Sequence, residues 1–221
     1  MSVKILVVLL TVTVLLVGVA LTIGGGSSIP MPGTTGLWGH GRMMGDGRRD
    51  PGTAMGAALA DAPGPRVSAA QATELAQQIP AGASVDRTAR QVTLSGSAVS
   101  FAAVASQSSM YSFQIAGMTN PSVTVPTGTR VSIQVINADN DMAHGVVVTM
   151  AHSTSWMPMM AAGPAFPGAG LFALGESTSA GLHTATITFT AGTPGRYTYL
   201  CAVADHARRG MLGSFTIQDH G

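Results

Sequence analysis

Cysteine, charge and aromatic side chains are all scarce in this sequence. The single cysteine among 221 residues, Cys201, excludes an internal disulfide and any CxxC metal or redox pair. Only 10% of the residues are charged and the formal net charge is +1, so the chain has no basic stripe for a nucleic-acid partner. It also has no Gly-rich phosphate loop and no alternation of strand and helix patterns. Nucleotide-binding and nucleic-acid-binding classes are therefore excluded.

Short apolar segments separated by turn residues make up most of the second half of the chain. Val131, Ile133 and Val135 alternate with polar residues, as in a strand with one buried face. Seven or eight such segments at a spacing of roughly 8–12 residues predict an all-β, Greek-key β-sandwich, preceded by a short helix within 68–79. Ser95 and Gly96 predict a hairpin turn. The expected strands lie in 90–96, 98–106, 110–117, 120–137, 144–150, 182–190, 195–201 and 211–218.

The N-terminus carries an uncharged apolar run, residues 5–23, directly after Lys4. As a helix at about 1.5 Å per residue it would span roughly 28 Å, close to the hydrocarbon thickness of a bilayer. A buried core helix would show a polar face, and none is present at any spacing. Gly18, Val19 and Ala20 form an acceptable cleavage site, but the apolar run continues past it. We therefore predict that residues 1–23 are an uncleaved transmembrane signal-anchor, with the rest of the chain extracytoplasmic.

Residues 24–65 are rich in Gly, Pro and Met and show no periodicity, so we predict a flexible linker between the anchor and a domain of residues 66–221. Within the linker, His40, Met43 and Met44 have the side chains that bind soft metals. Three scattered ligands in a Gly-rich segment are weak support for a site, and a solvated linker is the simpler interpretation.

The segment "YLCAVADHARRGM" holds Cys201, His206 and Met211 at equal spacings of five residues. Cys201 is expected at the end of one strand, His206 in the following loop and Met211 where the next strand begins. These three side chains can then converge on one point, and His144, at the start of its own strand, can add a second imidazole. The plain alternative is a buried free thiol beside a surface histidine and a core methionine.

Two imidazoles, one thiolate and a long axial thioether are the ligands of a blue-copper site. Thiolate binds copper covalently, imidazole suits both oxidation states, and a weak thioether favours Cu(I). A site whose geometry is a compromise between the two states rearranges little when an electron moves. The four residues therefore predict one type 1 copper ion, held by His144, Cys201, His206 and Met211.

The segment "GTPGRYTYLCAVADHARRGMLGSFTIQ" resembles the C-terminal ligand segment of the cupredoxins, the type 1 blue copper proteins. Upstream segments, among them "NPSVTVPTGTRVSIQVIN" and "MAHGVVVTM", follow the order of that family, so the resemblance covers about 68–218. It implies a copper site at the same four residues and a periplasmic or cell-surface electron carrier. The family usually has Ser or Asn directly after the first ligand histidine, where this chain has Gly145.

Three functions compete on the sequence. A copper oxidase or nitrite reductase needs paired histidines and a His beside the Cys, and this chain has neither, so we predict no enzymatic activity. A copper-delivery protein needs an open site of Met and His ligands, which a loop centred on Cys201 fits poorly. A membrane-tethered carrier of single electrons between respiratory partners, an unidentified cytochrome or oxidase, fits best. Met157, Met159 and Met160 either pack in the core or form an apolar collar around an exposed edge of His206, where a partner would dock.

Overall fold

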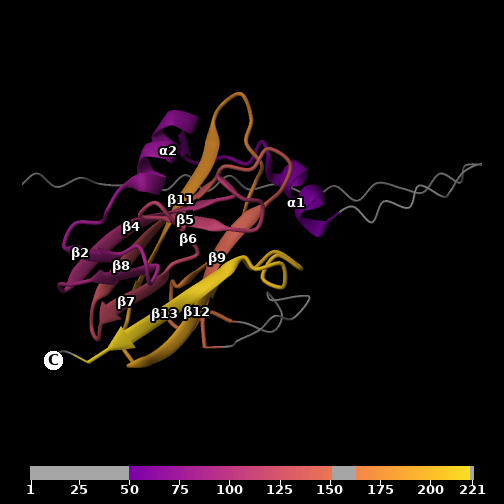
Figure 1. The fold of residues 1–221 in the computed structure, drawn as a ribbon. Coiled ribbons are helices and arrows are strands. Elements are labelled where there is room, and N and C mark those ends of the chain that lie inside the picture. The colour runs from indigo at the N-terminus through magenta and orange to yellow at the C-terminus, as the bar shows by residue number, and fades with distance from the viewer. Residues whose placement is uncertain (1–49, 151–162, 220–221) are drawn as a thin grey trace, which may run out of the picture. The chain divides into compact units, whose positions relative to one another are not determined.

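The computed structural model describes residues 50–150 and 163–219, which form two β-sheets and two short helices (Figure 1). One sheet has six strands in the order β1-β11-β8-β4-β5-β6 and the other has seven in the order β10-β9-β12-β13-β7-β3-β2. The first sheet consists of β1 (Arg66–Val67), β11 (Leu182–Thr190), β8 (Arg130–Asn137), β4 (Ala98–Ala105), β5 (Phe113–Ile115) and β6 (Met118–Thr119). The second consists of β10 (Gly170–Leu174), β9 (His144–Thr149), β12 (Gly195–Leu200), β13 (Leu212–Gln218), β7 (Ser122–Pro126), β3 (Gln91–Leu94) and β2 (Ala83–Asp86).

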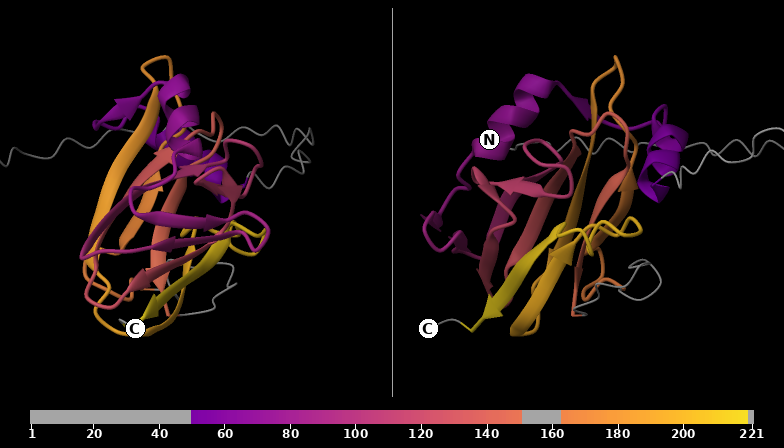
Figure 2. Two further views of the ribbon diagram at one scale, coloured as in Figure 1. Left: turned by 60° about the vertical axis from the view of Figure 1, so that its left-hand side comes forward. Right: turned by 45° about the vertical axis from the view of Figure 1, so that its right-hand side comes forward.

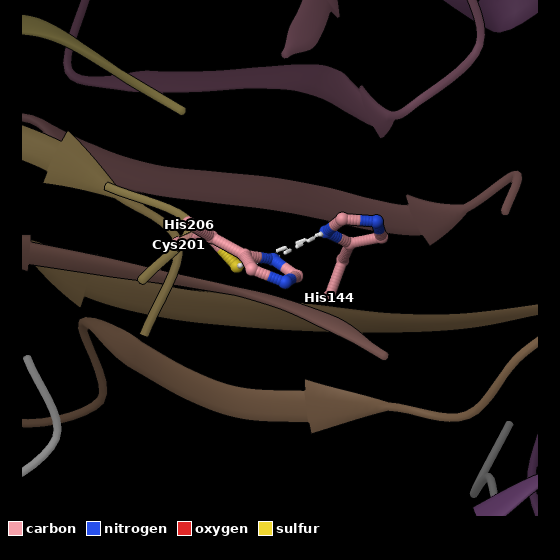
Figure 3. Close-up of side chains that lie close together, drawn as sticks. All are labelled: His144, Cys201 and His206. Carbon is pink, nitrogen blue, oxygen red and sulfur yellow. Dashed lines mark hydrogen bonds between the residues drawn. The ribbon is translucent and has the colours of Figure 1, made fainter. Parts of the chain in front are cut away.

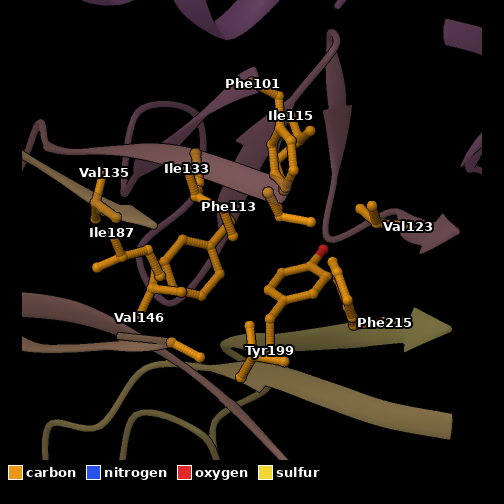
Figure 4. Close-up of a cluster of buried hydrophobic side chains, with 14 of the residues drawn as sticks. Phe101, Phe113, Ile115, Val123, Ile133, Val135, Val146, Ile187, Tyr199 and Phe215 are labelled. Carbon is orange, nitrogen blue, oxygen red and sulfur yellow. The ribbon is translucent and has the colours of Figure 1, made fainter. Parts of the chain in front are cut away.

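The apolar core fills the space between the two sheets (Figures 2 and 4). The alternation predicted in β8 is confirmed, because Val131, Ile133 and Val135 are buried there while Ser132 and Gln134 are partly exposed. Aromatic rings fill the centre. The Phe113 and Tyr199 rings, one from each sheet, meet edge to face with their centroids 5.8 Å apart. The predicted all-β sandwich is thereby confirmed.

The hairpin predicted at Ser95 and Gly96 is wrong. The strands on either side of this turn, β3 and β4, belong to different sheets: β3 pairs in parallel with β7, and β4 pairs in parallel with β8. The turn from β7 to β8 likewise crosses between the sheets. At both turns the chain crosses from one sheet to the other and forms an arch. The two arches then stack in parallel, a pairing between distant segments that a local turn signal cannot reveal.

The helix predicted within 68–79 is confirmed as α2 (Ala69–Gln77). Ser68 caps it in a capping box with Gln71, which satisfies two of the free N–H groups of the first turn. The helix buries Ala72 and Ala76, and it packs against the first sheet through β4.

Residues 50–65, predicted as the last part of a flexible linker, contain a helix, α1 (Pro51–Leu59). Asp50 caps its N-terminus by accepting a hydrogen bond from the Gly52 N–H at 2.8 Å, and Pro51 stands at the first helical position, where its missing N–H costs nothing. The helix carries no apolar stripe. It is held by close contacts at its buried glycines, Gly56 against the backbone of Met142 and Ala143 and Gly52 against the His206 ring, and such contacts leave no periodic signal in the sequence.

Three further sequence predictions concern segments that the structure does not describe. Residues 1–49 lie outside the described residues, and with them the predicted anchor and His40, Met43 and Met44. Residues 151–162, with Met157, Met159 and Met160, also lie outside them. In the described part of the chain, neither helix has the length and apolarity that a membrane crossing needs.

Candidate metal centre

One group of metal-ligating side chains forms at the end of the second sheet. His144 begins β9, Cys201 directly follows β12, and His206 lies in the loop between β12 and β13. Their donor atoms lie within 4.8 Å of one another and all three residues are fully buried. The close-up shows the two imidazole rings with ring nitrogens facing each other across a dashed line, and the Cys201 sulfur beside His206 (Figure 3). The structure therefore brings together three of the four residues that the sequence singled out, by side-chain contact.

The three donor atoms form a compact triangle. The Nδ1 atoms of His144 and His206 are 3.1 Å apart, and they lie 3.8 Å and 3.5 Å from the Cys201 Sγ. A point equidistant from the three atoms lies about 2 Å from each, which is the length of a metal–imidazole bond. Two imidazoles and a soft thiolate are a donor set that copper prefers. The residues present fit one type 1 copper ion.

Met211 joins this cluster through the backbone. Its side chain is fully buried, its carbonyl accepts a hydrogen bond from the Cys201 N–H at 3.0 Å, and its N–H donates to the His206 carbonyl at 3.0 Å. These two bonds close the loop between β12 and β13 into a compact turn. Cys201, His206 and Met211 are thus held by one short piece of hydrogen-bonded backbone.

The His144 ring is fixed from its far side. Its Nε2 lies 3.0 Å from Asp139 Oδ2 and 2.9 Å from Ser106 Oγ. Asn137 fixes the loop that carries Asp139, since its side-chain oxygen accepts from the Asp139 N–H and its amide donates to the Met142 and Gly175 carbonyls. A carboxylate that accepts the Nε2–H leaves the Nδ1 lone pair free for a metal, a common arrangement behind metal-binding histidines.

His206 is enclosed, so it has no exposed imidazole edge of the kind that one of the two interpretations of Met157, Met159 and Met160 required. Its Nε2 lies 3.4 Å from Asp50 Oδ1, and the Tyr111 ring stands edge-on to it with the centroids 5.0 Å apart. Both covering residues come from segments remote in sequence from the ligand loop. Asp50 is the N-cap of α1, a helix that was not predicted from the sequence.

The cluster shifts the protonation equilibria of its own members. Burial by itself lowers the pKa of His144, but the hydrogen bond to Asp139 and the contact with the Cys201 thiol outweigh burial and raise it to about 9. Burial likewise raises the pKa of the thiol, while the two imidazoles lower it to about 6. The metal-free pocket therefore favours the thiolate, the form of cysteine that binds metals.

Comparison with known proteins bears on the fold. No family model matches the sequence, and no curated protein matches it. Among solved structures, rusticyanin from Thiobacillus ferrooxidans matches with a TM-score of 0.59 and 24% identity, over 70% of this chain and 96% of that one. A second structure, of the copper protein rusticyanin, matches with a TM-score of 0.60 and 23% identity, over 70% and 97% of the two chains.

The fold of this chain is the rusticyanin fold. A structure of reduced rusticyanin agrees, with a TM-score of 0.59 and 23% identity over 70% of this chain and 99% of that one. The cupredoxin-like architecture predicted from the ligand segment is thereby confirmed. The rusticyanin fold brings the ends of β9 and β12 side by side, which places His144 beside Cys201.

Gly145, the position at which the sequence departs from the cupredoxin pattern, serves the site through its backbone. Its N–H donates a hydrogen bond to the Cys201 Sγ at 3.5 Å. A Cβ at this position would collide with the Leu171 and Phe172 carbonyl oxygens of β10. Gly145 therefore lets β10 approach β9, where the pairing is irregular between Leu171 and Leu174.

Four residues that support the cluster were not singled out from the sequence: Asp50, Ser106, Tyr111 and Asp139. Only Asp50 has a local signal, because an Asp directly before a Pro is typical of a helix start. A further histidine, His183, is buried away from the cluster, with its Nε2 2.8 Å from the Ala60 carbonyl oxygen.

We predict that Gly145→Ser lowers the free energy of unfolding by about 2 kcal/mol, because the new side chain overpacks against β10. Urea unfolding of the metal-free protein measures this. Gly192→Ser is the matched control, since Gly192 is exposed and a Cβ there meets open space. Equal stability of the two variants would show that β10 does not need a glycine at this position.

The metal-free protein should lose the Cys201 proton with a midpoint near pH 6, well below the value of about 8.5 for a free thiol. Because the folded-state pKa is the lower one, this group stabilises the fold fully above the unfolded-state pKa, and the contribution is lost as pH falls through about 6. Thiolate ultraviolet absorbance of the metal-free protein checks this, with Cys201→Ser as the baseline. A midpoint at or above the free-thiol value would contradict it.

Proposed function

We propose that this chain is a membrane-tethered, extracytoplasmic blue copper protein that carries single electrons between redox partners. One type 1 copper ion would be held by His144, Cys201, His206 and Met211. The proposal includes no substrate and no enzymatic activity. Bound in this site, copper would supply a reversible one-electron couple whose potential depends on the axial ligand and on hydrogen bonding around the sulfur.

The observation that carries the proposal is the preorganisation of the donor atoms. Two imidazole nitrogens and one sulfur lie about one bond length from a common point, in side chains that are fully buried. Asp139 and Asp50 lie against the far side of each ring. A site that is held this firmly resists rearrangement when its charge changes, which favours fast electron exchange.

Each residue has a separate part in this proposal. Cys201 supplies the thiolate, and its neighbour β12 gives a direct covalent route from the sulfur along a central strand of the sheet. The Gly145 N–H donates to that sulfur and withdraws negative charge from it. Met211, buried at the start of the returning strand, would supply the weak axial thioether. The two histidines would supply the two imidazole nitrogens.

The location and the partners rest on the sequence alone. We keep residues 1–23 as the proposed membrane anchor and include helix α1 in the proposed extracytoplasmic domain. The remaining residues of the predicted linker would tether the domain outside the cytoplasm. A cytochrome or an oxidase would exchange electrons with it there.

Copper delivery is the alternative function, and spectra of the copper-loaded protein distinguish it from electron transfer. A delivery site must be open to a recipient, whereas His144, Cys201 and His206 are fully buried. Adding Cu(II) to the purified protein should produce intense blue absorption and the narrow copper hyperfine EPR pattern of a type 1 site. A colourless complex would favour delivery and contradict the carrier.

Cys201→Ser should abolish the blue absorption while the sandwich stays folded, because the colour arises from the copper–thiolate bond. Absorption spectroscopy with Cu(II) measures the colour, and circular dichroism verifies the fold. Blue colour in the variant would reject the proposed ligand set.

Met211→Leu should keep the blue colour and raise the reduction potential, because a missing axial donor leaves Cu(II) less well supported. Potentiometric titration of the variant beside the unsubstituted protein measures the change. An unchanged or lowered potential would show that Met211 is not the axial ligand.

A further inference from the structure

The Asp50 carboxylate links helix α1 to a proposed copper ligand. One oxygen, Oδ1, accepts the Gly52 N–H at 2.8 Å and lies 3.4 Å from His206 Nε2. The same atom therefore caps the helix and faces the ring nitrogen that points away from the thiol. Asp50 is only 11% exposed, so this contact is screened from solvent.

The second oxygen of Asp50 is fixed by two donors. Tyr111 donates its hydroxyl to Oδ2 at 3.1 Å, and Arg209 Nη2 lies 3.4 Å from the same atom. Arg209 also lies over the Tyr111 ring, 4.8 Å from its centroid, and bonds Asp205 at 2.7 Å. With both oxygens engaged, the carboxylate cannot rotate freely away from the imidazole.

Helix α1 is anchored in a way that fixes Asp50. Gly56 packs against the backbone of Ala143, the residue directly before His144, so closely that a Cβ on Gly56 would lie 2.8 Å from the Ala143 nitrogen. The Gly52 carbonyl accepts the Ala143 N–H at 2.9 Å. At the other end, Arg66 donates to the Ala60 carbonyl at 2.8 Å. The helix therefore has little freedom to slide.

Gly52 brings the helix itself against the ligand. A Cβ at this position would lie 2.6 Å from His206 Nε2, closer than real side chains approach. The first turn of α1 thus covers the imidazole edge directly, with Asp50 beside it. These two contacts help to explain why His206 is fully buried.

We propose that Asp50 is a positioning residue for His206: it accepts the Nε2–H and so holds the Nδ1 lone pair toward the Cys201 sulfur. The inference rests on the proposed copper site, of which α1 then becomes a part. Both histidines are oriented in the same way, since Asp139 accepts from His144 as Asp50 does from His206. One carboxylate comes from the loop before β9 and the other from α1.

The test separates helix capping from ring positioning. Asp50→Ser keeps a good N-cap but is too short to reach His206, whereas Asp50→Asn keeps the cap and a neutral acceptor for the ring. Asp61→Asn removes the same charge just beyond the other end of α1, at an exposed position, and serves as the control. Two readouts are made: hydrogen exchange of the His206 Nε2–H by nitrogen-15 NMR on the metal-free protein, and Cu(II) affinity by chelator competition.

In Asp50→Ser, we expect faster exchange of the Nε2–H and a copper affinity lowered about 10- to 100-fold, the usual cost of losing a carboxylate behind a metal-binding histidine. Asp50→Asn should fall between this variant and the unsubstituted protein, and Asp61→Asn should match the latter. Unchanged exchange and affinity in Asp50→Ser would overturn the proposal and leave Asp50 as a helix cap only.

A second variant covers the case in which Asp50→Ser does not fold. Tyr111→Phe keeps the ring against His206 but removes the hydroxyl that holds Asp50 Oδ2, so a smaller change in the same direction is expected. No change in exchange or affinity in Tyr111→Phe and Asp50→Asn would also overturn the proposal. If the protein binds no copper, the proposed function fails, yet the exchange measurement on the metal-free protein still decides whether Asp50 holds the ring.

Discussion

The structure depends on holding two imidazole nitrogens and one sulfur within bonding distance of a common point, in a pocket closed to solvent. Crowding three lone-pair-bearing atoms in this way is unfavourable unless a proton or a cation lies among them. The surroundings of the cluster lower the pKa of the Cys201 thiol and raise the pKa of His144, so that a thiolate lies beside an imidazolium. The same arrangement suits a cation of soft character.

Rigidity of the centre comes from elements that surround it on every side. Strands β9 and β12 are neighbours in one sheet, which fixes the separation of His144 and Cys201. The hydrogen bonds between Cys201, His206 and Met211 fix the loop that returns to β13. The Gly145 N–H donates a hydrogen bond to the Cys201 sulfur, and because glycine has no side chain, β10 can pack closely against this position. Ligand geometry is thus a property of the packed sandwich and not of the ligand loop alone.

The sequence predicted the three residues of the ligand loop and also His144, at the start of a separate strand. Cys201, His206 and Met211 were found from their spacing, and the burial of Val131, Ile133 and Val135 from simple alternation. Asp50 and Tyr111 could not be placed at His206, because they lie far from it in the chain and their contacts follow from packing. The strands around Ser95 and Gly96 were paired wrongly for the same reason: which sheet a strand joins is decided by its distant neighbours.

By itself, the sequence determined the class of this protein's fold and singled out the side chains that we propose as metal ligands, because strand alternation and the spacing of Cys201, His206 and Met211 are local properties of the chain. Only the tertiary structure decided that helix α1 covers His206 and that Gly145 serves the sulfur through its backbone. Those features depend on close approaches between segments remote in sequence. Small residues such as Gly52 and Gly56 permit such approaches without leaving a pattern that can be read beforehand.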